Sequence, residues 1–127
     1  MRQPRSSRMR KVDELLREVI AEEVGRLKDP RIGFVTVTGV DTSPDLRRAT
    51  VFYSALGTDD EQADIAAALA HAAPHVQQRI AAQVRMKFTP VLTFSVDEAV
   101  QRGLRLSRIL HELEQEPPVD QSGEVGE

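Results

Sequence analysis

The chain has 127 residues, of which 40% are hydrophobic and 29% charged, and its formal net charge is -3. This composition is typical of one globular domain that buries a core without help from metals or disulfides. The absence of cysteine excludes disulfides, thiolate zinc sites and cysteine nucleophiles. No apolar run has the length of a secretory signal or a membrane span, so we expect a cytoplasmic protein without membrane contact.

The first half of the chain predicts a helix followed by a pair of strands. Apolar residues recur every three or four positions between residues 7 and 27, which is typical of an amphipathic helix, and Asp29-Pro30 ends it. Residues 34–40 and 48–56 are rich in β-branched and aromatic residues and predict two antiparallel strands, joined by turn chemistry at residues 42–45. One face of the second strand is predicted to hold Ala49, Val51, Tyr53 and Ala55.

The second half predicts two helices, a third strand and a last helix. Residues 58–61 match a capping box, and the acids there lie beside the positive end of the next helix. Pro74 is expected to interrupt this helix and to start another, because proline lacks an amide hydrogen and clashes with the preceding turn. A third strand is predicted over residues 87–96. Asp97 is expected to cap a final helix with apolar positions at Val100, Leu104, Ile109, Leu110 and Leu113.

The predicted order of elements is α-β-β-α-α-β-α. It favours an α+β domain with a three-stranded sheet and helices packed on one face. We expect a single domain over residues 7–113, preceded by a basic arm at residues 1–6. Residues 114–127 are acidic and contain Pro, Gly and Ser, so this tail is expected to be disordered.

All five aromatic residues lie on predicted strands, where a stacking surface for single-stranded nucleic acid would also lie. The strand pattern favours core positions for Phe34, Phe88 and Phe94. Phe52 and Tyr53 are expected on opposite faces, so one of them must face outward or lie beneath another element.

Catalytic chemistry has little support in the sequence. His71 and His75 are four residues apart, but two ligands do not make a zinc site and Pro74 disturbs the helical face between them. The chain has no GxSxG, HExxH or glycine-rich phosphate loop, and no nucleophile, base and orienting group can be nominated together. We therefore expect no enzymatic activity, no cofactor and no metal.

Charge is segregated along the chain. Residues 1–11 carry five basic groups and no acid, whereas residues 57–70 carry four acids and residues 112–127 carry six acids, both without a base. Residues 76–108 carry six basic groups against two acids. Such basic residues would position phosphates without reading a base sequence. The alternative is that the charge runs are only solvated faces and tails.

Two segments carry a resemblance to a known family. Residues 36–57, TVTGVDTSPDLRRATVFYSALG, combine a strand, a Ser-Pro-Asp-Leu turn and an aromatic second strand. Residues 84–110, VRMKFTPVLTFSVDEAVQRGLRLSRIL, combine a short basic stretch, Thr-Pro, a Phe-bearing strand and a closing helix. With the opening helix, these segments resemble the ribosome-binding factor A family of small bacterial assembly factors over about residues 7–113.

The resemblance implies a type II KH-like fold, α-β-β-α-α-β, in which a helix-kink-helix replaces the usual KH glycine loop. The family's kink, Ala-x-Gly, falls on Ala72, Ala73 and Pro74. Proline thus stands where glycine is usual; both break a straight helix, but proline fixes φ. The family's basic residue three positions after the kink falls on Gln77, and Arg79 is a candidate substitute.

The resemblance also implies a ribosome maturation factor. It would bind the free 30S small ribosomal subunit and not 70S ribosomes, and assist late maturation of the subunit core and 16S rRNA processing. The implied partners are the 30S subunit and 16S rRNA, with the region of its 5′-terminal helix as a candidate contact, and the chain would act as a monomer. The predicted RNA-binding residues are Arg5, Arg8, Arg10, Lys11, Arg79, Arg85, Lys87 and Arg105. The alternative is a protein-interaction module that docks on a partner protein through its sheet edge or last helix.

Overall fold

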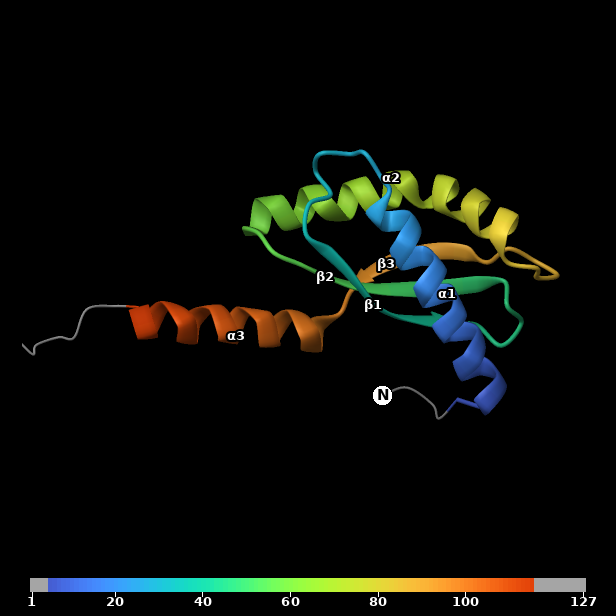
Figure 1. Cartoon of the computed structure of the whole chain (residues 1–127), viewed down its shortest axis with the longest axis horizontal. Helices are drawn as coiled ribbons and strands as arrows, with labels where there is room; N and C mark the ends of the chain where they lie inside the picture. The colour runs from blue at the N-terminus through green and yellow to red at the C-terminus, as the bar shows by residue number, and fades with distance from the viewer. Residues whose placement is uncertain (1–4, 116–127) are drawn as a thin grey trace, which may run out of the picture.

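The structure is a computed structural model that describes residues 5–115 (Figure 1). The start of the predicted basic arm, residues 1–4, and the acidic tail from residue 116 lie outside the described residues. The elements in chain order are α1 (Ser7–Gly25), β1 (Val35–Thr42), β2 (Arg48–Ala55), α2 (Asp59–Gln83), β3 (Val91–Val96) and α3 (Glu98–Gln115).

Helix α1 begins where the sequence predicts it. Ser6 is the N-cap, and its side chain accepts a hydrogen bond from the Met9 amide at 3.2 Å. The apolar stripe of the helix buries Leu16, Ile20 and Val24 against the sheet. The helix ends at Gly25, with Arg26 as its C-cap, a few residues before the predicted end at Asp29-Pro30.

The β1–β2 hairpin is antiparallel, which confirms the predicted pair. The Ser43 amide donates to the Arg48 carbonyl at 2.8 Å, and the Asp45 carboxylate accepts from the Ser43 hydroxyl at 2.6 Å and from the Arg47 amide at 3.1 Å. These bonds hold Leu46 at a φ of 63°, a left-handed conformation that is uncommon for leucine. The predicted core face of β2 is buried at all four positions.

Strand β3 pairs in parallel with β2, so the sheet order is β1-β2-β3 and β2 is central. The register runs from Arg48 opposite Val91 to Tyr53 opposite Val96. The strand begins at Val91, later than predicted, because Pro90 has no amide hydrogen to give to the ladder. The pairing places residues 84–90 beside the β1–β2 turn, where the Val91 amide donates to the Arg47 carbonyl at 2.9 Å.

The expected break at Pro74 is wrong: α2 is one helix from Asp59 to Gln83, with Pro74 inside it. The predicted capping box is present, since Thr58 and Glu61 exchange hydrogen bonds at 2.8 and 3.2 Å. The buried stripe of the helix continues across the proline from Leu69 to Val76. This packing, together with the alanine-rich flanks, keeps the chain helical although Pro74 cannot donate a hydrogen bond. The helix axis instead changes direction along its length (Figure 1).

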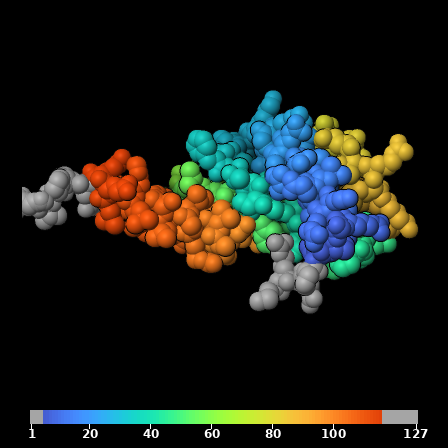
Figure 2. Space-filling view, turned by 60° about the horizontal axis from the view of Figure 1, so that its bottom comes forward, coloured from blue at the N-terminus to red at the C-terminus, as the bar shows by residue number. Residues whose placement is uncertain are grey.

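Helices α1 and α2 share one face of the sheet, where α1 packs on β1 and α2 on β3. The core between these layers contains Ile65, Leu69, Val76 and Ile80 of α2 together with the buried residues of α1 and of the strands. Helix α3 does not cover this face, and none of its residues is buried. It extends away from the sheet, joined to the domain by its first turns (Figures 1 and 2). The α+β class is confirmed, but the expected packing on one face holds for α1 and α2 only.

The five aromatic residues differ in their burial. Phe34 was expected in the core, but 80% of it is exposed: it precedes β1 and lines a surface hollow beside the start of α2. Phe88 and Phe94 are half-buried. Tyr53 is buried in the core and Phe52 is half-buried on the other face of β2, as their alternation predicts. Within residues 5–115, no helix has the length and apolar character needed to cross a membrane.

Candidate nucleic-acid interface

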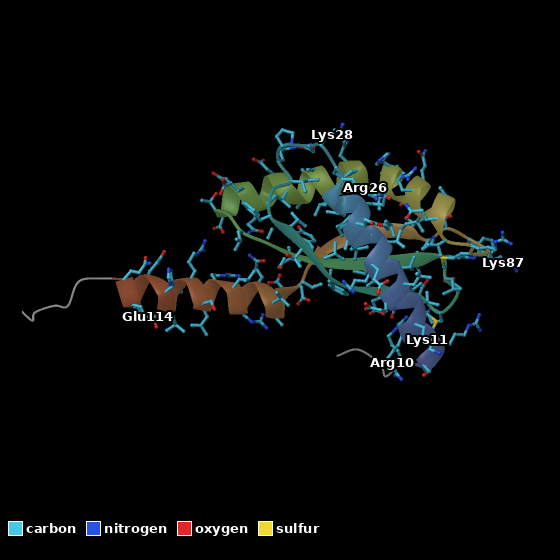
Figure 3. The ribbon with its side chains drawn as sticks, in the orientation of Figure 1. Arg10, Lys11, Arg26, Lys28, Lys87 and Glu114 are labelled. Carbon is cyan, nitrogen blue, oxygen red and sulfur yellow. The ribbon has the colours of Figure 1, made fainter. Side chains whose placement is uncertain are left out.

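Three segments that are distant in sequence meet at one end of the domain. The start of α1 is attached to the end of β1, since the Thr42 amide donates to the Asp13 carboxylate at 2.9 Å. The β1–β2 turn in turn contacts the loop before β3. We call the exposed cations on these segments the basic end; they are Arg8, Arg10, Lys11, Arg47, Arg48, Arg85 and Lys87. Figure 3 shows Arg10, Lys11 and Lys87 at this end of the molecule and Glu114 at the other.

The loop of residues 84–90 is organised around Phe88. The Arg47 guanidinium carbon lies 3.9 Å from the centroid of the Phe88 ring, and the Lys87 ammonium lies 5.5 Å from it. A cation above an aromatic face is attracted by the ring quadrupole, so the ring can hold two positive groups near each other. The turn and the loop therefore present cations together, although more than thirty residues separate them in sequence.

Arg5 has a structural role that the sequence did not predict. Its guanidinium contacts Asp13 and also donates to Asp41 Oδ1 at 2.6 Å and to the Thr42 carbonyl at 2.6 Å. Only 20% of its side chain is exposed. Two carboxylates balance its charge, so Arg5 anchors the start of α1 to β1 and is not free to bind a phosphate. Its carbonyl in turn accepts from Arg10 at 2.7 Å.

Arg8, Lys11 and Arg85 are the cations of the basic end whose side chains have the fewest interactions within the described part of the chain. All three are exposed, and none has an ion pair or side-chain hydrogen bond within the described part of the chain. The nearby turn contains the carboxylate of Asp45, whose pKa is lowered, first by the hydrogen bond from Ser43. That carboxylate is already used within the turn, so it does not pair with these three cations.

Arg79 and Arg105, also predicted to bind RNA, lie apart from the basic end. Arg79 Nε is 3.4 Å from the Glu23 carboxylate, and its side chain is 46% exposed. Arg105 lies on α3 and lines a hollow of about 220 Å³ with Asp59, at the acidic start of α2. The structure therefore does not gather the eight predicted cations into one surface.

The predicted kink residues differ in exposure: Ala73 is buried, Ala72 is half-buried and Pro74 is exposed. Gln77, which stands where the family's basic residue is expected, accepts the Leu92 amide at 3.0 Å through its side-chain oxygen. It thereby satisfies a backbone donor at the start of β3. A cation at this position could not accept that bond.

Sequence reasoning missed Arg47 and Arg48. Their signal was visible as two adjacent arginines directly after the Ser-Pro-Asp-Leu turn, but only the parallel pairing of β3 brings them beside the loop that carries Arg85 and Lys87. His71 and His75 are both exposed, and no three candidate metal ligands gather anywhere in residues 5–115.

The sequence matches one family of known proteins. Residues 8–110 match the family model described as "Ribosome-binding factor A". The chain is 47% identical over 109 residues to the ribosome-binding factor A of Rubrobacter xylanophilus, covering 84% of this chain and 88% of the relative. It is 37% identical to that of Geobacter sulfurreducens, covering 90% and 98% of the two chains.

Known structures of the same family also match this chain. The crystal structure of ribosome-binding factor A from Thermus thermophilus aligns with a TM-score of 0.64 and 28% identity, covering 69% of this chain and 94% of the other. A homology model of the Thermus thermophilus factor, fitted into a cryo-EM map of a complex with 30S, aligns with a TM-score of 0.57 and 30% identity, covering 68% and 91%. The chain belongs to the ribosome-binding factor A family.

Proposed function

We propose that this chain binds the free 30S small ribosomal subunit, and not 70S ribosomes, and assists late maturation of the subunit core and 16S rRNA processing without catalysis. The observation that carries the proposal is the convergence of exposed cations from three segments at the basic end of a member of this family. The relative from Thermus thermophilus that has been fitted into a 30S complex supports the choice of particle.

The basic end suits rRNA phosphates more than bases. Arginine presents a planar fork that matches phosphate oxygens, and the set contains Arg8, Arg47 and Arg85. Contacts of this kind fix position and orientation and carry no sequence information. The proposed phosphate-binding set is Arg8, Arg10, Lys11, Arg47, Arg48, Arg85 and Lys87, with Arg79 as a separate contact; Arg105, on α3, lies outside this set.

The bend of α2 contributes to this arrangement. Pro74 is exposed and lies nine residues before the end of the helix at Gln83, and the loop with Arg85 and Lys87 follows directly. The direction of the second half of α2 therefore decides where these two cations lie. In this proposal Ala72, Ala73 and Pro74 orient the interface and do not themselves carry charge toward RNA.

The mechanism is preferential binding. A factor that binds one conformation of immature rRNA more tightly than another shifts the population toward the first, by no more than the difference in its two affinities. The chain would act as a monomer in the cytoplasm on 16S rRNA, with the region of the 5′-terminal helix as a candidate contact.

Co-sedimentation of the full chain with separated 30S, 50S and 70S particles tests the proposal. We expect the chain to pellet with 30S subunits and not with 70S ribosomes, with an affinity that falls steeply as salt rises, because phosphate contacts release condensed counterions. Failure to pellet with 30S subunits would overturn the proposal. Salt-insensitive binding would favour the alternative, a module that docks on a partner protein.

A further inference from the structure

The outer half of α3 carries an apolar stripe that no part of the described chain covers. Leu106, Ile109, Leu110 and Leu113 are 57%, 50%, 53% and 59% exposed. Their spacing is i, i+3, i+4 and i+7, which places them on one side of the helix. This is the anchor pattern by which an amphipathic helix occupies an apolar groove.

The side of α3 that touches the domain is a different one. Gln101 donates to the Ala55 carbonyl at 2.8 Å and accepts the Ala55 amide at 3.1 Å, so it continues the hydrogen bonding at the end of β2. Asp97, just before the helix, accepts the Thr38 hydroxyl at 2.7 Å. At 100° per residue, the stripe lies nearly opposite Gln101 and Leu104. The stripe therefore lies on the side of α3 opposite its attachment, on a helix that projects from the domain (Figure 2).

Arginines border this stripe. Arg102 and Arg105 precede Leu106 and Ile109 by one helical turn each, and both are exposed. A groove that accepts the stripe would therefore meet these guanidinium groups at its rim, and carboxylates there would complement them. Leucine and isoleucine gain nothing from phosphate oxygens, so the stripe favours a protein surface over RNA backbone.

We propose that α3 is a docking helix, whose stripe occupies an apolar groove with a carboxylate-bearing rim on a protein of the small ribosomal subunit. That this partner belongs to the small ribosomal subunit rests on the proposed function. A second copy of the chain fits less well: four half-exposed side chains offer on the order of 400 Å², so a pair would bury on the order of 800 Å², below the ~1,200 Å² of specific interfaces, whereas on the subunit the contacts of the basic end add to the area of the stripe. Residues 116–127 contain only two aliphatic branched residues, Val119 and Val125, too few to cover the stripe.

A photoreactive benzoylphenylalanine in place of Leu110 tests the proposal directly. The full chain is bound to purified 30S subunits and irradiated, and the cross-linked product is identified by mass spectrometry. We expect a cross-link to one ribosomal protein, at a segment with apolar residues and acids. The same group in place of His111, which lies on the other side of α3, is the matched control and should give at least about tenfold less of this product.

A second measurement uses variants that leave the core intact, because α3 buries no residue. Ile109→Ser with Leu110→Ser should weaken 30S binding about tenfold and leave its salt dependence unchanged, whereas Ser107→Ala with His111→Ala should have no effect. A cross-link to rRNA only, a cross-linked dimer, or subunit binding with no α3 cross-link would each overturn the docking helix alone. Absence of any 30S binding by the unmodified chain would overturn the proposed function as well.

Discussion

The Glu23 carboxylate of α1 accepts a hydrogen bond from Gln83 Nε2 of α2 at 2.6 Å, and only 3% of its side chain is exposed. Arg26 donates to the same carboxylate at 2.9 Å, and Arg79 approaches it at 3.4 Å. Burial by itself raises the pKa of Glu23, but the bond from Gln83 and the charges of Arg79 and Arg26 outweigh it, and the pKa lies below its ordinary value of 4.5. This buried acid joins the two helices of the core layer.

Replacing Glu23 by Gln should lower the free energy of unfolding at neutral pH by about 1–3 kcal/mol, because two arginines lose a buried partner. A group whose pKa is depressed on folding stabilises above its unfolded pKa, and that stability is lost as the pH falls through the folded pKa. The variant should therefore lose less stability than the parent on acidification below about pH 4.5. Urea unfolding at a series of pH values measures this. Glu22→Gln, an exposed neighbour, should change little.

Replacing Arg5 by Ala should lower the free energy of unfolding by about 1–3 kcal/mol, because the buried Asp13 and the half-buried Asp41 lose their shared cation. Arg8→Ala, one turn away and exposed, should cost less than about 0.5 kcal/mol. Thermal unfolding of both variants checks the structural role given to Arg5. Equal stability of the two variants would contradict it.

Changing Arg85 and Lys87 to Glu should lower 30S affinity at least about tenfold, which is ~1.4 kcal/mol, with a native circular dichroism spectrum. The slope of log affinity against log salt should flatten by about 0.7–0.9 for each lost contact. The control variant reverses the charge of Asp59 and Asp60 at the acidic start of α2. This variant should bind the 30S subunit as tightly as the parent or more tightly. If the control loses the subunit and the basic variant keeps it, the interface lies elsewhere.

Replacing Pro74 by Ala should raise the free energy of unfolding by about 1–3 kcal/mol, because alanine restores an amide donor and is the better helix former. The same change should straighten α2 and move the loop that carries Arg85 and Lys87. We therefore expect weaker 30S binding together with higher stability, measured by urea unfolding and by co-sedimentation. A variant that is less stable than the parent would show that packing of the bent helix requires the proline.

The local elements of this protein could be predicted from its sequence because their causes are local. The start of α1 at Ser7, the turn at residues 42–45 and the capping box at Thr58 and Glu61 each depend on residues a few positions apart. The alternation in β2 identified the buried face for the same reason. The resemblance to the family also rested on contiguous segments.

Only the tertiary structure shows the features that depend on contacts between residues far apart in sequence. Arg5 and Arg8 are both basic residues near the start of the chain, but only Arg5 reaches the carboxylates of Asp13 on α1 and Asp41 on β1. Pro74 remains within a helix because the sheet packs against the residues on both sides of it. The parallel pairing of β3 with β2 brings Phe88 beneath Arg47, and no local propensity encodes that contact, because it forms only when the whole crossover through α2 closes.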